Sequence, residues 1–258
     1  MQKNSLLVSK KIRKKILKIS YLAQSAHIAS ALSIVDIITV LYLKIINKNF
    51  KNTFILSKGH ACLAHYCLLN ELGIISDKIL KSYGKNNSIL MSHSSHKVKG
   101  VELSTGSLGH GLPVATGIAM SNLLQKKKER VFVLLSDGEL NEGSNWEAIL
   151  FAAHHKLKNL VIFIDYNKIQ SLDFVKRTIK LDPLNKKFKS FGCNVVSVDG
   201  HNHKQIINAL QKNSSKPLII IANTIKGKGI SFMENKVLWH YRPPNKNELE
   251  KGLIELEK

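Results

Sequence analysis

The sequence predicts an α/β fold in which helices cover both faces of a mainly parallel sheet. Apolar runs at 131–135, 160–164 and 218–222 are typical of strands buried on both faces, and 194–198 is a weaker fourth. Between the first two runs, the apolar residues of segment 144–156 recur at helical spacing. A strand, a helix and a second strand within about 35 residues form a right-handed βαβ unit, so the two strands are expected to run parallel.

Further helices are expected upstream of these strands, at 33–46, 61–72 and 112–125. A chain of 258 residues is long enough for one sizeable domain with a full core. We expect a single domain over residues 1–258, with a short helical extension at the N-terminus and a tail at the C-terminus.

Composition favours a cytoplasmic protein without a membrane partner. No apolar run approaches the roughly 20 residues that a membrane-spanning helix needs. The N-terminal stretch MQKNSLLVSKKIRKK lacks the continuous apolar segment of a signal peptide. Three cysteines are few, and an odd number does not suggest a disulfide framework.

The net charge of +21 has two interpretations. It is typical of a protein that binds nucleic acid or another polyanion. It is also what general Lys enrichment produces, because Lys, Asn and Ile are abundant along the whole chain. The densest basic runs, 10–18 and 126–130, contain no interleaved aromatic residues that could stack bases. A nucleic-acid partner is therefore not expected.

The turn SDGELNEG, residues 136–143, places acidic residues directly after a strand. Asp137 stands at the carboxyl end of the first apolar run, and Asn167 stands at the corresponding end of the next. If the strands are neighbours, the two side chains converge at the edge of the sheet where α/β proteins bind ligands. Both offer hard oxygen ligands of the kind that Mg²⁺ prefers, usually together with phosphate. The alternative is an ordinary Asp-Gly turn or helix cap.

A glycine-rich segment, STGSLGHGLP, is the candidate for binding phosphate. Gly106, Gly109 and Gly111 precede a helix whose start is marked by Pro113. Glycines let the backbone approach an anion closely, and a helix N-terminus offers it free N–H groups. The spacing matches neither the dinucleotide fingerprint nor the P-loop, so a tight packing turn is the alternative.

Several of the 11 histidines stand in polar or glycine-flanked segments, among them His27, His60, His96 and His240. Such residues suit proton transfer to a substrate with many hydroxyl groups near neutral pH. The alternative for each is an ordinary surface or supporting role.

Taken together, these segments resemble the thiamine-diphosphate-binding half of transketolase, over about 25–244. The motifs stand in family order: SAHIASALSIVDII, LSKGHA, GVELSTGSLGHGL, SDGELNEGSNWEA, DYNKIQS, VDGHN and KGKGISFMENKVLWH. The most specific element is Asp137-Gly138 followed about 30 residues later by Asn167. The resemblance is strongest to short N-terminal subunits of transketolases that are split over two chains. It implies a thiamine-diphosphate-binding fold and a single domain of the pyrophosphate-binding type.

The resemblance also implies a binding site for thiamine diphosphate and Mg²⁺. Asp137 and Asn167 would hold Mg²⁺ through their side chains, and Ile169 through its backbone carbonyl. The residues expected at the cofactor are His60, Gly106, Ser107, Leu108, Gly138, Glu139, Asn167 and His240. Within that set Glu139 is expected to support the turn, with no role at the metal.

Catalytic roles are implied for four histidines. His60 and His240 would reach the diphosphate or the reacting centre, and His27 and His96 would face the sugar hydroxyl groups. Glu142 matches a carboxylate that the family buries where two subunits meet.

The chain departs from the family pattern at three places. Ser136 replaces the usual Gly before the metal ligand, and Ser is small enough to be tolerated. The histidine that the family flanks with glycines stands here in Ala26-His27-Ile28, which puts the shape of the donor-sugar pocket in question. Tyr166 replaces a second Asn that often precedes the metal ligand.

The resemblance implies a transketolase-type transferase (EC 2.2.1.-) of carbohydrate metabolism, such as the pentose phosphate reactions. A two-carbon ketol unit would pass from a ketose to an aldose or sugar phosphate, with thiamine diphosphate carrying the chemistry. The family's catalytic glutamate belongs to a second domain, for which the residues up to Lys258 leave no room. We therefore expect a separate C-terminal subunit that supplies this glutamate, in a heterotetramer.

Two alternatives stay open at this point, besides a decayed subunit kept as a structural partner, against which the intact Asp137, Asn167 and His60 argue. The first is another thiamine-diphosphate enzyme subunit, of the deoxyxylulose-phosphate synthase or decarboxylase type, or one that acts on an unusual sugar. The second is a basic nucleic-acid-binding protein on the same scaffold. Thiamine-diphosphate binding that requires Mg²⁺, compared with salt-dependent retention on DNA, separates the two classes.

Overall fold

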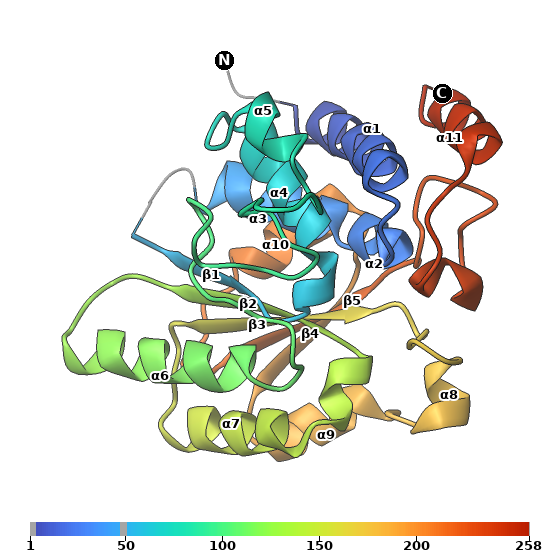
Figure 1. Cartoon of the computed structure of the whole chain (residues 1–258). Coiled ribbons are helices and arrows are strands. Elements are labelled where there is room, and N and C mark those ends of the chain that lie inside the picture. Colours follow the sequence, from blue (N-terminus) through green and yellow to red (C-terminus); the bar gives the residue numbers. More distant parts are fainter. Residues whose placement is uncertain (1–3, 47–50, 258) are drawn as a thin grey trace.

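A twisted parallel sheet of five strands forms the centre of the molecule (Figure 1). The structure is a computed structural model and describes residues 4–46 and 51–257, so residues 1–3 and 258 of the expected domain lie outside it. The strands are β1 Thr53–Leu56, β2 Val131–Ser136, β3 Leu160–Tyr166, β4 Asn194–Asp199 and β5 Leu218–Asn223. They pair in the order β1-β2-β3-β5-β4, every pair parallel. The α/β prediction is confirmed.

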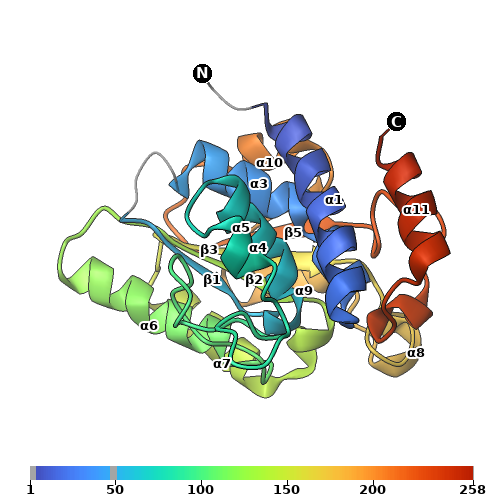
Figure 2. The ribbon, with the colours of Figure 1, turned by 45° about the horizontal axis from the view of Figure 1, so that its top comes forward.

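Helices cover both faces of this sheet (Figure 1). One face carries α1 Ser5–Ala23, α2 Ile28–Ser33, α3 Val35–Lys44, α4 Cys62–Glu71, α5 Asp77–Leu80 and α10 His203–Leu210. The other face carries α6 Gly111–Leu124, α7 Gly143–His154 and α9 Leu184–Ser190. Two peripheral helices are α8 Val175–Thr178 and α11 Lys246–Glu255, and α11 packs beside α1 (Figure 2). No helix in the described part of the chain is both long and apolar enough to cross a membrane.

Each central strand contributes to both hydrophobic cores, which explains its unbroken apolar sequence. In β2, Phe132 and Leu134 belong to the core beneath α1–α4, whereas Val131, Val133 and Leu135 belong to the core beneath α6 and α7. All five side chains are buried. Alternation along a strand therefore sends every side chain into an apolar layer, as expected for a doubly covered parallel sheet.

The predicted strands and helices are confirmed apart from the bounds of one helix, and one strand was missed. The helix predicted at 33–46 is α3, which begins at Val35 because Ser33 is the last residue of α2. Residues 28–42 are all buried, so no polar face marks the boundary between the two helices. Strand β1, only four residues long, is too short for a periodic signal.

A buried charged cluster ties the N-terminal helix to the loops beside the sheet. Asp36 accepts hydrogen bonds from Arg13 of α1, and its carboxylate lies 2.8 Å from His201 Nδ1 and 3.0 Å from His203 Nε2. Burial opposes ionisation of this carboxyl group, but its histidine and arginine partners hold the pKa of Asp36 far below its usual range. His201 Nε2 accepts the backbone N–H of Ile225, which fixes the start of the loop after β5.

Candidate active site

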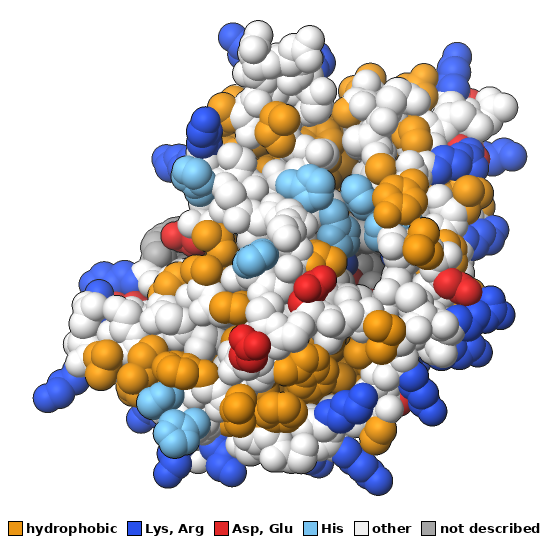
Figure 3. Space-filling model, turned by 60° about the horizontal axis from the view of Figure 1, so that its bottom comes forward, with side chains coloured by type: hydrophobic (Ala, Val, Ile, Leu, Met, Phe, Trp, Pro, Cys, Tyr) orange, Lys and Arg blue, Asp and Glu red, His pale blue; other side chains and the backbone are white. Residues whose placement is uncertain are grey.

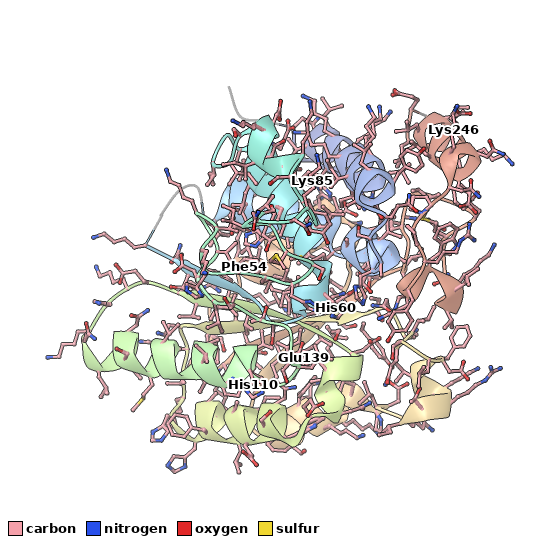
Figure 4. The ribbon with its side chains drawn as sticks, viewed as in Figure 1. Phe54, His60, Lys85, His110, Glu139 and Lys246 are labelled. Carbon is pink, nitrogen blue, oxygen red and sulfur yellow. The ribbon has the colours of Figure 1, made fainter. Side chains whose placement is uncertain are left out.

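Four strand ends meet at one cavity of about 220 Å³. Register pairs Ser136 of β2 with Asp165 of β3, so the chain leaves both strands at the same edge of the sheet. Segments that follow β1 and β5 join them there. The cavity is lined by His27, Ser30, Lys58, His60, His93, Gly106, Leu108, Ser136, Asp137, Gly138, Asn167, Ile169, Gln170, Ser171, Lys226, His240 and Tyr241. Histidine side chains gather around this hollow in Figure 3, and Figure 4 labels His60 beside it.

Three oxygen donors converge at the β2 and β3 ends of the cavity. Asp137 Oδ2 accepts a hydrogen bond from the backbone N–H of Lys168, the residue between Asn167 and Ile169. Lys168 has a left-handed backbone with φ of 66°, which turns the chain sharply after Asn167. This turn keeps the carboxylate of Asp137, the amide of Asn167 and the backbone of Ile169 against one cavity.

Asp165 fixes the orientation of the Asn167 amide. Asn167 Nδ2 donates to Asp165 Oδ2 at 3.0 Å, so the oxygen Oδ1 is directed to the other side, where the N–H of Ile169 also donates to it. The same carboxylate accepts hydrogen bonds from Ser33 Oγ, Lys58 Nζ and Thr224 Oγ1. Burial opposes its ionisation, but the Lys58 ammonium holds the pKa of Asp165 below its usual value. Four segments of the chain are thereby joined at one buried charge.

The charges at this site are suited to a small, hard cation. Burial, and then the neighbouring Asp165 carboxylate, raise the pKa of Asp137 to about 7, so its ionised form lacks sufficient positive charge nearby. The backbone carbonyl of Ile169 accepts a hydrogen bond from the Lys226 ammonium at 3.0 Å, which shows that it is directed at a cation. A carboxylate, an amide oxygen and a carbonyl are the donors that Mg²⁺ takes. Among the described residues, no group of three or more His, Cys, Asp or Glu is placed to hold a metal ion.

Four histidine rings surround the opening of the cavity, and three of them are held neutral by their surroundings. The centroid of the His27 ring lies 5.3 Å from that of His60, 5.0 Å from His240 and 6.1 Å from His93. Burial and nearby cationic side chains lower the pKa of His27 to about 4 and of His240 to about 3. Burial and Lys58 also lower the pKa of His60 well below its usual value. Neutral imidazoles can both donate and accept hydrogen bonds, as a polyhydroxylated substrate requires.

The glycine-rich segment reaches the cavity through Gly106 and Leu108. Behind it, Glu139 Oε1 accepts hydrogen bonds from Ser57 Oγ and from the backbone N–H of Gly109. Gly109 has φ of 84°, and a Cβ there would stand 2.6 Å from Ser144 Oγ, so only glycine fits. Burial raises the pKa of Glu139. This carboxyl group holds the glycine-rich segment against the β1 and β2 ends, and Figure 4 shows Glu139 in this region.

Three residues expected at the cofactor or the substrate do not line the cavity, and neither does Glu142, which is expected at a subunit interface. Ser107 is exposed between its two lining neighbours, and Glu139 is buried behind them. His96 is exposed, with Nδ1 2.7 Å from Ser104 Oγ, and lies outside the cavity lining, so its role toward the sugar stays a prediction. His93 takes the place next to His27. Glu142 is exposed at the start of α7, outside the cavity.

Sequence reasoning missed Lys58, His93, Lys226 and Tyr241 as lining residues. Lys58 and Lys226 stood inside quoted motifs, SKGH and KGKG, but one more lysine carries little information in so basic a chain. Both are fully buried here. Burial, and then Lys58, lower the pKa of Lys226 to about 8. Lys58 is already paired with Asp165, but Lys226 forms no ion pair among the described residues, so its buried ammonium points to an anionic ligand.

A parallel sheet whose carboxyl ends carry a glycine-rich segment, oxygen donors and buried cations is typical of α/β proteins that bind a phosphorylated ligand at this edge. Residues 6–252 match the family described as transketolase, thiamine diphosphate binding domain. The chain belongs to this family.

Its relatives include single subunits of transketolases. The chain is 42% identical over 260 residues to an apulose-4-phosphate transketolase subunit of Actinobacillus succinogenes, covering 96% of this chain and 94% of that one. It is 33% identical over 243 residues to 6-deoxy-6-sulfo-D-fructose transketolase subunit SqwG of Clostridium sp., covering 90% and 88%. The crystal structure of Campylobacter jejuni transketolase superposes with a TM-score of 0.91 at 27% identity, covering 97% of this chain and 43% of that one.

These matches show a thiamine-diphosphate-dependent subunit of the transketolase type, a transferase that moves a ketol unit. The predicted fold, family and enzyme class are confirmed. The nucleic-acid-binding and decarboxylase alternatives are not favoured.

Proposed function

We propose that this chain is the N-terminal subunit of a split transketolase that binds thiamine diphosphate through Mg²⁺ and acts on sugar phosphates. The observation that carries the proposal is the convergence of Asp137, Asn167 and the Ile169 carbonyl beside two buried lysines. Asp137 and Asn167 bind Mg²⁺ through side-chain oxygens, and Ile169 through its carbonyl. Gly138 and Asn167 contact the cofactor diphosphate, and Lys226 neutralises part of its charge.

When bound, thiamine diphosphate supplies the carbon nucleophile that accepts the two-carbon unit. The side chains of the chain position the substrate and hold the protons near it. His60 and His240 hold protons near the reacting centre, and His27 and His93 bind substrate hydroxyl groups. Burial lowers the pKa values of His27 and His240, so both rings are neutral at pH 7, and each has one nitrogen that donates and one that accepts a hydrogen bond. Gly106 and Leu108 shape the wall against which the cofactor ring lies.

A partner chain supplies the remaining half of the site in this proposal, including the catalytic glutamate. Relatives that are themselves named as transketolase subunits support a separate partner chain. Helices α6 and α7 expose Val114, Leu150 and Phe151, and Figure 3 shows apolar side chains gathered on this face. Exposed Glu142 precedes α7. We infer that a second copy of the chain covers this face and that two C-terminal subunits complete a heterotetramer. A cytoplasmic location and a single-domain organisation stay predictions.

Co-expression tests the proposal directly. The chain is produced with candidate C-terminal subunits, and ketol transfer is measured on a panel of ketose phosphates that includes apulose 4-phosphate, with aldose acceptors. We expect activity only in the two-chain complex. Full activity of this chain by itself, or no activity with any partner that forms a stable complex, contradicts the proposal.

Two matched pairs of variants test the residue assignments. Asp137→Asn is expected to weaken Mg²⁺-dependent thiamine-diphosphate binding by at least tenfold in the complex, whereas Asp199→Asn, at the exposed end of β4, leaves it unchanged. Leu150→Lys is expected to reduce the assembled mass in light scattering, whereas Ile254→Lys on α11, equally exposed, is expected to leave it intact. Equal effects within either pair contradict the corresponding assignment.

A further inference from the structure

A basic hollow of about 670 Å³ lies at the opposite end of the sheet from the cofactor cavity. It is formed by the loop between α6 and β2, the loop between α7 and β3, and the segment after α10. In Figure 1 the first of these loops lies at the left, away from the strand ends that carry His60 in Figure 4. Its lining residues are Ile45, Leu123, Lys126, Lys127, Lys128, Arg130, Lys158, Asn159, Leu210, Gln211, Lys212, Asn213 and Ser214. The volume is within the range of small-molecule sites, roughly 300–1,000 Å³.

The hollow is lined by more Lys and Arg residues than the composition of the chain predicts. Lys and Arg make up 39 of 258 residues, so about two are expected among the 13 residues that line the hollow. Six are found, and none of the 13 is acidic. Glu129, the acidic residue of the same segment, is not among them. General lysine enrichment therefore does not account for the clustering.

These six cations also lack carboxylate partners. Ion pairs elsewhere engage residues such as Arg13, Lys58 and Arg242, but within the described part of the chain none involves a cation of this hollow. Arg130 is half-buried, where its Nη1 donates to the Leu210 carbonyl at 3.0 Å and its guanidinium lies 5.0 Å from the Phe132 ring centroid. Burial lowers its pKa. A guanidinium removed from water without a counter-ion is suited to an incoming phosphate.

We propose that this hollow is a second ligand site that binds a small anion with two or more phosphate groups. Arg130 provides the anchor, and the lysines from three loops surround the remaining charge. Ile45, Leu123 and Leu210 give the hollow an apolar wall for the uncharged part of the ligand. Nucleic acid fits less well because none of the 13 lining residues is aromatic, so the hollow offers no platform on which bases could stack. The site is independent of the proposed transketolase function.

Calorimetry on the full chain tests this site, with tripolyphosphate and ATP as probes and no divalent cation present. Lys127→Ala/Lys128→Ala/Lys212→Ala is compared with Lys78→Ala/Lys81→Ala/Lys85→Ala, which removes the same number of exposed charges elsewhere. We expect saturable one-to-one binding that weakens at least tenfold in the first triple variant and less than twofold in the second. Loss of binding in the first triple variant, whose residues line the hollow and not the cofactor cavity, separates the two sites.

Three results would overturn the proposal. The first is no saturable binding of either probe at millimolar concentration. The second is an equal loss in both triple variants, which would mean that only the net charge matters. The third is tighter binding of a short single-stranded RNA than of either probe, lost on the same substitutions, which would make the hollow part of a nucleic-acid surface.

Discussion

Replacing Asp165 by asparagine tests whether one buried carboxylate organises the cofactor edge of the sheet. The side chains of Asp165 and Lys58 are 0% and 1% exposed, so both charges are removed from water. In Asp165→Asn the Lys58 ammonium loses its anionic partner and keeps only neutral acceptors, the asparagine amide oxygen and the Ser30 carbonyl at 3.3 Å. Removing one member of a buried pair costs about 3–5 kcal/mol. That is about a fifth or more of the total stability of a typical domain.

Urea and thermal unfolding of the chain at pH 7.5 measure this cost. For a domain of this size, each kcal/mol lowers Tm by about 2–4 °C, so we expect Asp165→Asn to lower Tm by roughly 6–20 °C. Asp199→Asn, an exposed carboxylate at the end of β4, is the control and is expected to change stability by less than about 1 kcal/mol.

A double-mutant cycle separates the ion pair from general damage to the core. Lys58→Met alone leaves Asp165 without its cation, and we expect a cost similar to that of Asp165→Asn. In the double variant no buried charge is left unpaired, so its cost is expected to fall short of the sum of the two single costs by about 2 kcal/mol or more. Strict additivity, or a cost below about 1 kcal/mol for Asp165→Asn, would refute the reasoning.

The remaining predictions concern pH and glycine. Burial lowers the pKa of His65 to about 3, so the folded chain keeps this ring neutral while the unfolded chain protonates it below about pH 6.5. The free energy of unfolding therefore falls by roughly 2 kcal/mol between pH 7 and pH 5. His65→Gln is expected to remove this contribution to the pH dependence measured by urea unfolding. An unchanged pH dependence contradicts the assignment. Gly59→Ala is expected to lower Tm because its Cβ would stand 2.3 Å from the Thr105 carbonyl oxygen. Gly117→Ala, where the added Cβ meets no atom on α6, is expected to raise stability by about 0.5–1 kcal/mol. Tm shifts of the same sign in the two glycine variants would contradict this account.

The sequence by itself determined the class of fold and the edge at which the site lies. The apolar runs that became β2, β3 and β5 are buried on both faces, so their composition had to be almost purely apolar. Asp137 and Asn167 interrupt that pattern where strands end, and parallel strands leave their carboxyl ends at one edge. These signals are local, so they can be identified in the sequence without any information on tertiary contacts.

Only the tertiary structure decided which residues complete the site and which do not. Lys58 and Lys226 are two of many lysines in the sequence, and folding alone distinguishes them by burying both at one cavity. His93 and His96 have similar neighbours along the chain, but only His93 is turned toward His27. The basic hollow is likewise assembled from three loops that are far apart in sequence. Burial and long-range proximity arise from packing between segments, and no periodic pattern within one segment encodes them.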